Sequence, residues 1–201
     1  MERRKLPRQK RAKVTVDNIL QAANELINEE GFASIGTGAI AERAGVNIAS
    51  LYQYFPNRDT ILLSLYEEAA AQGAIKLNAL TMKIVHDDLE VIVPKVMKLL
   101  LTHYEQNAAI LLRMVNEVPE IRRATRVVPF ENMMNSSIRL YLQQHPEYHA
   151  KNTSRHIFFL RNIIVSNLQQ YVTAPPSDVS KTEFLAHLSR IIIAYLKGEL
   201  N

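Results

Sequence analysis

Apolar residues recur every three or four positions along nearly the whole chain, which is the spacing that buries one face of an α-helix. No segment shows the alternation of a half-buried strand, and neither an Asn-Gly nor an Asp-Gly hairpin turn occurs. The pattern therefore predicts an all-α fold of about nine helices. We expect these helices over residues 15–30, 37–44, 47–54, 58 to about 77 or beyond, 87–106, 107–117, 119–144, 153–172 and 180–197.

The stretch from Thr37 to Phe55 is predicted to form two short helices joined by a tight turn, which is a helix-turn-helix. Gly45 stands where the turn needs a positive φ, and Asn47 can cap the second helix with its side chain. Leu51 and Phe55 are spaced to face inward, so the remaining side chains of that helix point outward. The outward face carries hydrogen-bonding and flat groups, which suits contact with base edges and phosphates.

A helix capped by Thr15 and ended by Gly31 is expected to supply the third side of a small core beneath the helix-turn-helix. Residues 15–60 would then form a three-helix DNA-binding domain. Before it, residues 1–14 hold seven basic side chains and one acidic side chain, with Pro7 and no apolar period. We expect a flexible basic arm that follows the phosphate backbone or enters a minor groove. The alternative is a solvated tail without a partner.

Residues 61–201 are predicted to form a second helical domain. Pro56 stops the preceding helix and Asn57 caps the next one, which leads from the DNA-binding domain into this second domain. The last two helices carry more apolar side chains than one buried stripe needs, namely Phe158, Phe159, Ile163, Val165, Ile191, Ile192, Ile193 and Tyr195. Either these helices lie in the middle of the domain or they form the interface of a homodimer, and we expect the homodimer.

Composition excludes several classes of function. The chain has no cysteine, which excludes disulfides, cysteine nucleophiles and thiolate metal sites. No Glu-x-x-His pair, phosphate-binding glycine loop or G-x-S-x-G motif occurs, and Pro146 interrupts the pair of His145 and His149. We therefore predict no enzyme activity, metal site or cofactor. No apolar run approaches the roughly 20 residues of a membrane span, so we expect a cytoplasmic protein without a membrane partner.

The run from Ile19 to Glu67 resembles the N-terminal domain of the TetR family of bacterial regulators. The resemblance is carried by ILQAANELINEEGF and by TGAIAERAGVNIASLYQYFPNRDTILLSLYEE, of which AERAGV followed by SLYQYFPNR is the most specific part. The rest of the chain resembles the family only in its helical pattern and its length. The resemblance implies a homodimeric regulator, most often a repressor, whose third helix enters the major groove at each half of a palindromic operator in double-stranded DNA.

Carried over by position, the resemblance implies phosphate contacts from Thr37, Tyr54 and Arg58. The positions that meet bases or adjacent backbone are Asn47, Ile48, Ala49, Ser50, Tyr52 and Gln53. Ser50 and Gln53 can hydrogen-bond to base edges, whereas small apolar side chains can pack on a thymine methyl group. Gly36 and Gly38 depart from the family pattern, so Thr37 is expected to act as both helix cap and phosphate donor.

In the family, the C-terminal domain binds a small molecule between helices four to eight, and its binding shifts the fourth helix so that the heads no longer fit the operator. Such coupling needs about 1 to 3 kcal/mol of differential binding. The implied effector is a small apolar or amphipathic molecule of unknown identity. Its candidate contacts are Met97, Leu101, Tyr104, Phe130, Met133, Met134 and Phe158, with His103, Arg113, Asn116 and Arg161 as polar anchors.

Two other functions stay open at this point. One is an architectural DNA-binding protein that has no effector and is indifferent to sequence. The other is a helical ligand-binding or scaffold protein whose head contacts another protein. Duplex binding measured against salt concentration, with and without residues 1–14, separates these functions from each other.

Overall fold

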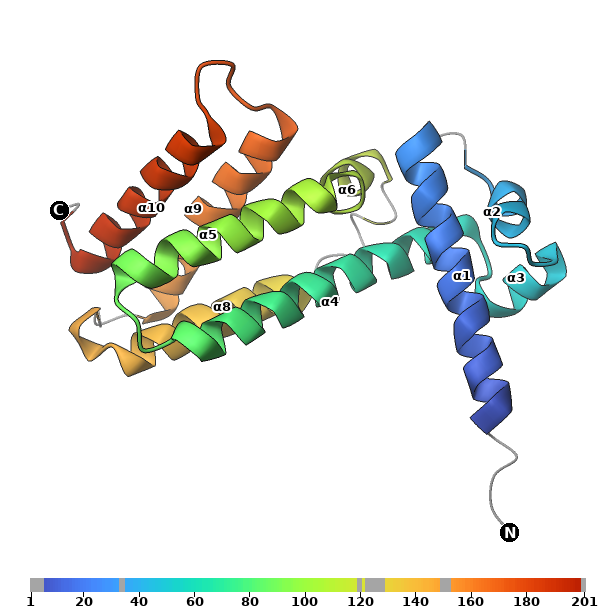
Figure 1. Cartoon of the computed structure of the whole chain (residues 1–201), viewed down its shortest axis with the longest axis horizontal. Helices are drawn as coiled ribbons and strands as arrows, with labels where there is room; N and C mark the ends of the chain where they lie inside the picture. The colour runs from blue at the N-terminus through green and yellow to red at the C-terminus, as the bar shows by residue number, and fades with distance from the viewer. Residues whose placement is uncertain (1–5, 33–34, 119–120, 122–128, 149–152, 200–201) are drawn as a thin grey trace, which may run out of the picture. The chain divides into compact units, whose positions relative to one another are not determined.

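The structure is a computed structural model that describes residues 6–32, 35–118, 121, 129–148 and 153–199. These residues form nine α-helices and no strand, as the all-α prediction requires (Figure 1). The helices are α1 (Leu6–Glu30), α2 (Thr37–Arg43), α3 (Ile48–Tyr54), α4 (Arg58–Ile84), α5 (Leu89–Gln106), α6 (Met114–Glu117), α8 (Pro129–Gln144), α9 (Thr153–Thr173) and α10 (Lys181–Lys197), with a π-helix η1 (Ala109–Arg113) and a 3-10 turn η2 (Pro146–Tyr148). None of the described helices has an apolar stretch long enough to cross a bilayer.

The chain divides into two compact units. The first, called the head here, comprises residues 1–68 and 113–126, and the second, called the helical unit, comprises residues 69–112 and 127–201. The boundary expected at residue 60 falls inside α4, which runs without interruption from Arg58 to Ile84. Helix α4 therefore contributes its first part to the head and the remainder to the helical unit.

The core of the head forms where α1 packs on α2 and α2 packs on α3. Ile19, Ile40 and Leu51 are completely buried there, one from each helix. The turn between α2 and α3 has Gly45 at a φ of 65°, a conformation that costs glycine little because it has no Cβ. The predicted turn at Gly45 is therefore confirmed.

Helix α1 begins at Leu6, so the prediction that Thr15 caps it is wrong, as is the expectation of a flexible arm for residues 6–14. The Thr15 hydroxyl donates to the carbonyl oxygen of Arg11 at 3.0 Å, a bond within the helix. Pro7 lies in the first turn, where no intrahelical partner is needed for its missing N–H. The residues between Pro7 and Thr15 are mostly good helix formers, which allows a helix without an apolar period.

The helical unit is organised around α5, which packs against both α9 and α10, while α8 packs against α9. Asp88 occupies the N-cap position of α5. Ser180 and Glu183 form a capping box at the start of α10, and Gly198 ends that helix in the left-handed conformation. The helix starts expected near residues 87 and 180 and the end expected at residue 197 are confirmed.

The middle of the chain differs from the expected pattern. Instead of one helix over residues 107–117, the chain forms the π-helix η1 and then the short helix α6. Helix α8 starts at Pro129, where proline is well tolerated as a first helical residue. Most of the predicted helical stretch before Pro129, residues 119, 120 and 122–128, lies outside the described residues.

Candidate nucleic-acid interface and small-molecule cavity

Helix α3 is held so that one face is buried and the opposite face is open. Asn47 caps the helix, because its Oδ1 accepts a hydrogen bond from the backbone N–H of Ala49 at 2.8 Å, as the sequence predicts. Leu51 is completely buried and Phe55 is buried after the last turn. Ser50 is half-buried, and the exposed residues are Ile48, Ala49, Tyr52, Gln53 and Tyr54. The open face therefore carries an amide, two phenols and small apolar groups.

The hydroxyl oxygens of Thr37 and Tyr52 lie 2.9 Å apart, and either can be the donor. This hydrogen bond joins the first turn of α2 to the exposed face of α3. Gly36, rather than Thr37, occupies the N-cap position of α2, and no side chain caps that helix. The expected capping role of Thr37 is therefore wrong, because Thr37 is the first residue inside the helix and its hydroxyl pairs with Tyr52.

Arg58 lies at the start of α4 and is half-buried. One of its Nη atoms donates to the backbone carbonyl of Phe32, which directly follows the end of α1 at Gly31. This hydrogen bond ties α4 to the loop after α1. The guanidinium thus holds the head together, and its contact with phosphate stays a prediction.

Two more cations are engaged within the head. Arg43 of α2 donates two hydrogen bonds to the carboxylate of Glu29, at 3.0 and 2.8 Å, and thereby links α2 to α1. This bidentate pair lowers the pKa of Glu29 and raises that of Arg43. Arg113, expected as an effector anchor, lies with its Cζ 5.8 Å from the centre of the Phe32 ring. These two arginines are therefore structural contacts of the head.

The first turns of α1 add positive charge to the same unit. Arg11 and Lys13 are exposed on α1. Their exposure leaves both cations accessible to a polyanion, which agrees with a role for the basic segment but replaces the expected arm by a helix over residues 6–14.

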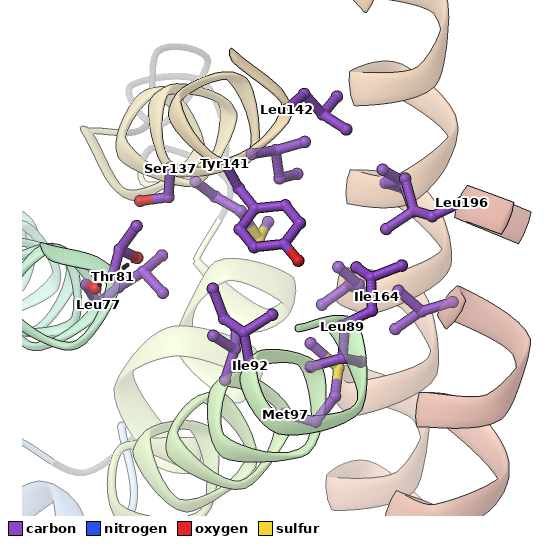
Figure 2. Close-up of a pocket in the computed structure, with 16 residues that line it drawn as sticks. Leu77, Thr81, Leu89, Ile92, Met97, Ser137, Tyr141, Leu142, Ile164 and Leu196 are labelled. Carbon is purple, nitrogen blue, oxygen red and sulfur yellow. Dashed lines mark hydrogen bonds between the residues drawn. The ribbon is translucent and has the colours of Figure 1, made fainter. Parts of the chain in front are cut away.

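The helical unit contains a partly open cavity of about 80 Å³ between α4, α5, α8, α9 and α10 (Figure 2). Its wall is nearly all hydrocarbon, with contributions from Leu77, Ile92, Met97, Met134, Ile138, Leu160, Ile164, Ile192 and others. Figure 2 shows the ring of Tyr141 lying among these side chains. The cavity can hold an apolar group, since the described residues leave no ionised side chain in its wall.

Tyr141 closes one side of the cavity and ties α8 to the turn between α4 and α5. Its hydroxyl donates to the Asp87 carbonyl oxygen at 3.1 Å, and burial raises the pKa of this phenol above its usual range. Behind it, the His145 ring stacks on the Tyr141 ring with centres 4.2 Å apart. His145 Nε2 lies 2.9 Å from the Val85 carbonyl oxygen, and His145 Nδ1 lies 2.9 Å from Glu147 Oε1.

Only Met97 and Met134 of the predicted effector contacts line this cavity. Leu101, Tyr104 and His103 are buried elsewhere along α5, Met133 is half-buried, and Phe158 is exposed. Arg161 lies with its Cζ 5.8 Å from the Phe158 ring centre. The side chains of Asn116 and Phe130 lie outside the described residues. No bound molecule tests these contacts, so they stay predictions.

Sequence reasoning missed Tyr141 and Ile138, although a signal for them exists. Met134, Ile138 and Tyr141 are spaced by four and three residues and so share one face of α8. The same spacing places them in the cavity wall. Met133 was predicted because it is apolar, but its position on α8 does not bring it into the cavity wall.

An apolar surface is open on α9 and α10. Phe158 is 55% exposed, Phe159 is 42% exposed and Ile191 is 48% exposed. The two phenylalanine rings meet edge to face with centres 5.5 Å apart. These residues belong to the set from which the sequence predicts a dimer interface. No group of three or more His, Asp or Glu side chains among the described residues could hold a metal ion.

Comparison with known proteins shows what the head is similar to. The family described as "Bacterial regulatory proteins, tetR family" matches residues 19–65. The "Fatty acid metabolism regulator protein" of Bacillus subtilis (strain 168) is 40% identical over 65 residues, which are 32% of this chain and 32% of that protein. The match thus spans about a third of the length of that relative.

Two solved structures share the fold over almost the whole chain. The fatty acid degradation regulator FadR from Bacillus halodurans has a TM-score of 0.66 and 16% identity, over 89% of this chain and 94% of that one. The Thermus thermophilus repressor FadR in complex with lauroyl-CoA has a TM-score of 0.65 and 17% identity, over 92% of this chain and 95% of that one. At these identities the likeness shows that the helical unit, as well as the head, has the fold of these regulators.

Proposed function

We propose that this chain, whose residues 19–65 match the family described as "Bacterial regulatory proteins, tetR family", is a transcriptional regulator that binds operator DNA as a homodimer. We further propose that it is a repressor released by a small molecule. The open face of α3 is the observation that carries the proposal. An α-helix fits the major groove, and the exposed residues of α3 are of types that read bases and hold phosphates.

Each exposed group of α3 has a role in this proposal. The Gln53 amide can make two hydrogen bonds to adenine, and Ile48 and Ala49 can pack on a thymine methyl group. The hydroxyls of Tyr52 and Tyr54 donate to phosphates. Thr37 orients the Tyr52 hydroxyl through the 2.9 Å hydrogen bond. The interface thus combines base contacts in the middle of the face with backbone contacts around them.

The homodimer is proposed to form through α9 and α10. Burial of the exposed Phe158, Phe159 and Ile191 against the same surface of a second copy removes apolar area from water. A two-fold dimer presents two copies of α3, which suits an operator whose half-sites are one turn of DNA apart, about 34 Å.

The effector is proposed to bind in the cavity of the helical unit. Support comes from the cavity itself and from the shared fold of the Thermus thermophilus repressor solved with lauroyl-CoA. Leu77 and Thr81 in the cavity wall belong to α4, and the same helix begins at Arg58 in the head. A ligand that displaces these residues can therefore change the position of α4 and, with it, DNA affinity. We expect such a regulator to act in the cytoplasm, as a binding protein rather than an enzyme.

Selection of duplexes from a random library with the purified full-length protein tests the proposal. A two-fold symmetric consensus, together with a dimer in sedimentation, is the expected result. Binding without any sequence preference would instead favour an architectural protein, and no binding at low salt would favour a scaffold. Either outcome contradicts the proposed function.

Variants of α3 then test which face reads the DNA. Gln53→Ala should cost roughly 1 to 3 kcal/mol at one base pair of the consensus and change the preference there. Tyr54→Phe is the matched control on the same helix, since loss of a phosphate contact should weaken consensus and random DNA alike. Equal losses on all sequences for Gln53→Ala would show that a different face contacts the bases.

A further inference from the structure

The wall of the cavity contains no ionisable side chain that is charged at neutral pH. Its sixteen lining residues include only three with a polar group, Thr81, Ser137 and Tyr141, and each of these polar groups is a hydroxyl. An ion placed among hydrocarbon side chains loses its hydration without gaining a counterion. A charged group is therefore disfavoured in the cavity, whatever the shape of the molecule that carries it.

Two of the three hydroxyls already donate their protons to the backbone. The Thr81 hydroxyl donates to the Leu77 carbonyl oxygen at 2.9 Å, and the Tyr141 hydroxyl donates to the Asp87 carbonyl oxygen at 3.1 Å. Ser137 makes no hydrogen bond to any residue in the part of the chain that the structure describes, and it lines the cavity from α8. Ser137 is therefore the hydroxyl that can both donate to and accept from a bound molecule.

Two of the lysines next in sequence to the wall are paired with carboxylates. Lys197, which follows the lining residue Leu196, lies 2.5 Å from the carboxylate of Glu90, which follows the lining residue Leu89. This pairing lowers the pKa of Glu90 and raises that of Lys197. Lys95 lies 3.6 Å from Asp87 in the same way. A carboxylate in the cavity would compete with Glu90 for Lys197 and with Asp87 for Lys95.

From the hydrocarbon wall and the single unengaged hydroxyl, we infer that the cavity takes an uncharged aliphatic compound with one hydrogen-bonding oxygen, held by Ser137, and excludes ionised acids and amines. The inference rests on the proposed role of this cavity as the effector site. A cavity of about 150 Å³ holds benzene, so a volume of about 80 Å³ requires the wall to widen for a longer chain. Met97 and Met134 can supply that movement, because unbranched thioether side chains change rotamer readily.

Three probes of equal chain length test the inference on the full-length protein, namely 1-hexanol, hexanoate and hexylammonium at pH 7.5. Binding is measured by chemical-shift changes of the cavity methyl groups in NMR titrations. We expect 1-hexanol to bind at least about tenfold more tightly than either ion, since only the ions lose hydration without compensation. Hexanoate or hexylammonium binding as tightly as 1-hexanol would overturn the inference, as would no binding of 1-hexanol.

Matched variants locate the bound molecule. Ser137→Ala should weaken 1-hexanol binding several-fold, whereas Ser136→Ala should not, because the Ser136 hydroxyl donates to the Asn132 carbonyl oxygen on the exposed side of α8. Ile138→Phe should fill the cavity and abolish binding, and Ser137→Leu serves the same purpose if that variant does not fold. Unchanged binding in the folded cavity-filling variant would place 1-hexanol elsewhere and overturn the inference.

DNA binding is measured separately, without any of the three probes. Protein that binds 1-hexanol in the cavity but selects no operator would contradict the proposed function and leave the ligand class standing. Protein that selects an operator but does not bind 1-hexanol would contradict the ligand class alone. The two failures are therefore distinguishable.

Discussion

The Thr37 hydroxyl oxygen lies 2.9 Å from the Tyr52 hydroxyl oxygen and links the start of α2 to the exposed face of α3. Both residues were predicted as DNA contacts from the family resemblance, and the structure joins them by a hydrogen bond. An exposed hydrogen bond of this kind stabilises a fold by only about 1 kcal/mol. Its larger effect is expected on DNA binding, since it orients a phenol that would otherwise rotate freely.

A double-mutant cycle tests this arrangement. Thr37→Val and Tyr52→Phe should each weaken operator binding. The double variant should bind the operator more tightly than the sum of the two losses predicts, by about 0.5 to 1.5 kcal/mol. Thr37→Val combined with Tyr54→Phe is the control and should be additive, because no hydrogen bond joins those two side chains. Additive losses for both pairs in fluorescence anisotropy would show that the hydroxyl contact does not matter for binding.

The helix-turn-helix was predictable because its signals are local. A glycine at the turn, asparagines at the starts of α3 and α4, and a proline after α3 each act on the residues beside them. Asn57 illustrates the point, since its Oδ1 accepts from the backbone N–H of Thr60 at 2.9 Å and so caps α4 as expected. The family match over residues 19–65 covers the same stretch.

The start of α1 and the cavity wall could not be predicted from the sequence, each for its own physical reason. Residues 6–14 have no apolar period, but charged helix formers extend a helix that is already nucleated. In the cavity, periodicity identifies the buried face of α8, yet it cannot tell which buried side chains pack tightly and which leave a gap. Tyr141 faces the gap because residues of four other helices line the same cavity, and that depends on packing between distant segments.

Arg58 is expected to contribute to stability more than to phosphate binding. Arg58→Met keeps most of the side-chain volume and removes the donor to the Phe32 carbonyl, so urea unfolding should show a loss of about 1 to 3 kcal/mol in the head. The control is Lys13→Met, because Lys13 is exposed on α1. That control should leave stability unchanged and reduce the salt slope of DNA binding by about 1.

The opposite pattern would support the role that the family resemblance implies for Arg58. If Arg58→Met left stability unchanged but reduced the salt slope by about 1, its guanidinium would contact a phosphate in the complex. Circular dichroism in urea and anisotropy titrations at several salt concentrations distinguish the two cases.

Acidification is expected to destabilise the helical unit through His103. Burial lowers the pKa of this imidazole below its usual 6.5, and the positive charge of Lys76 adds to the effect. Below pH 6.5 the unfolded chain therefore binds more protons at this position than the folded chain does. The free energy of unfolding must then rise with pH between the folded-state pKa of His103 and its unfolded value of 6.5. It falls as the pH drops through that range.

The variant His103→Gln removes this titration. Its unfolding free energy, measured in urea between pH 5 and pH 7, should depend less on pH than that of the unaltered protein, whatever the absolute cost of the substitution. His86→Gln is the control, since His86 is exposed after α4. An unchanged pH dependence in His103→Gln would mean that His103 makes no contribution to the acid sensitivity.

The proposed dimer interface makes the last prediction. Phe158→Glu or Ile191→Asp places a charge on the apolar surface of α9 and α10, where each wild-type side chain is about half exposed, 55% and 48%. Because these positions are exposed in one copy, the substitutions should leave the monomer folded but prevent the surface from being buried against a second copy. Sedimentation velocity should then report a monomer, and operator affinity should fall at least about a hundredfold, since two linked half-site contacts become one.

Met82→Glu is the matched control on α4, because Met82 is 62% exposed and lies outside that surface. A dimer that survives both interface substitutions, or one that Met82→Glu disrupts, would place the contact between copies on another face of the helical unit.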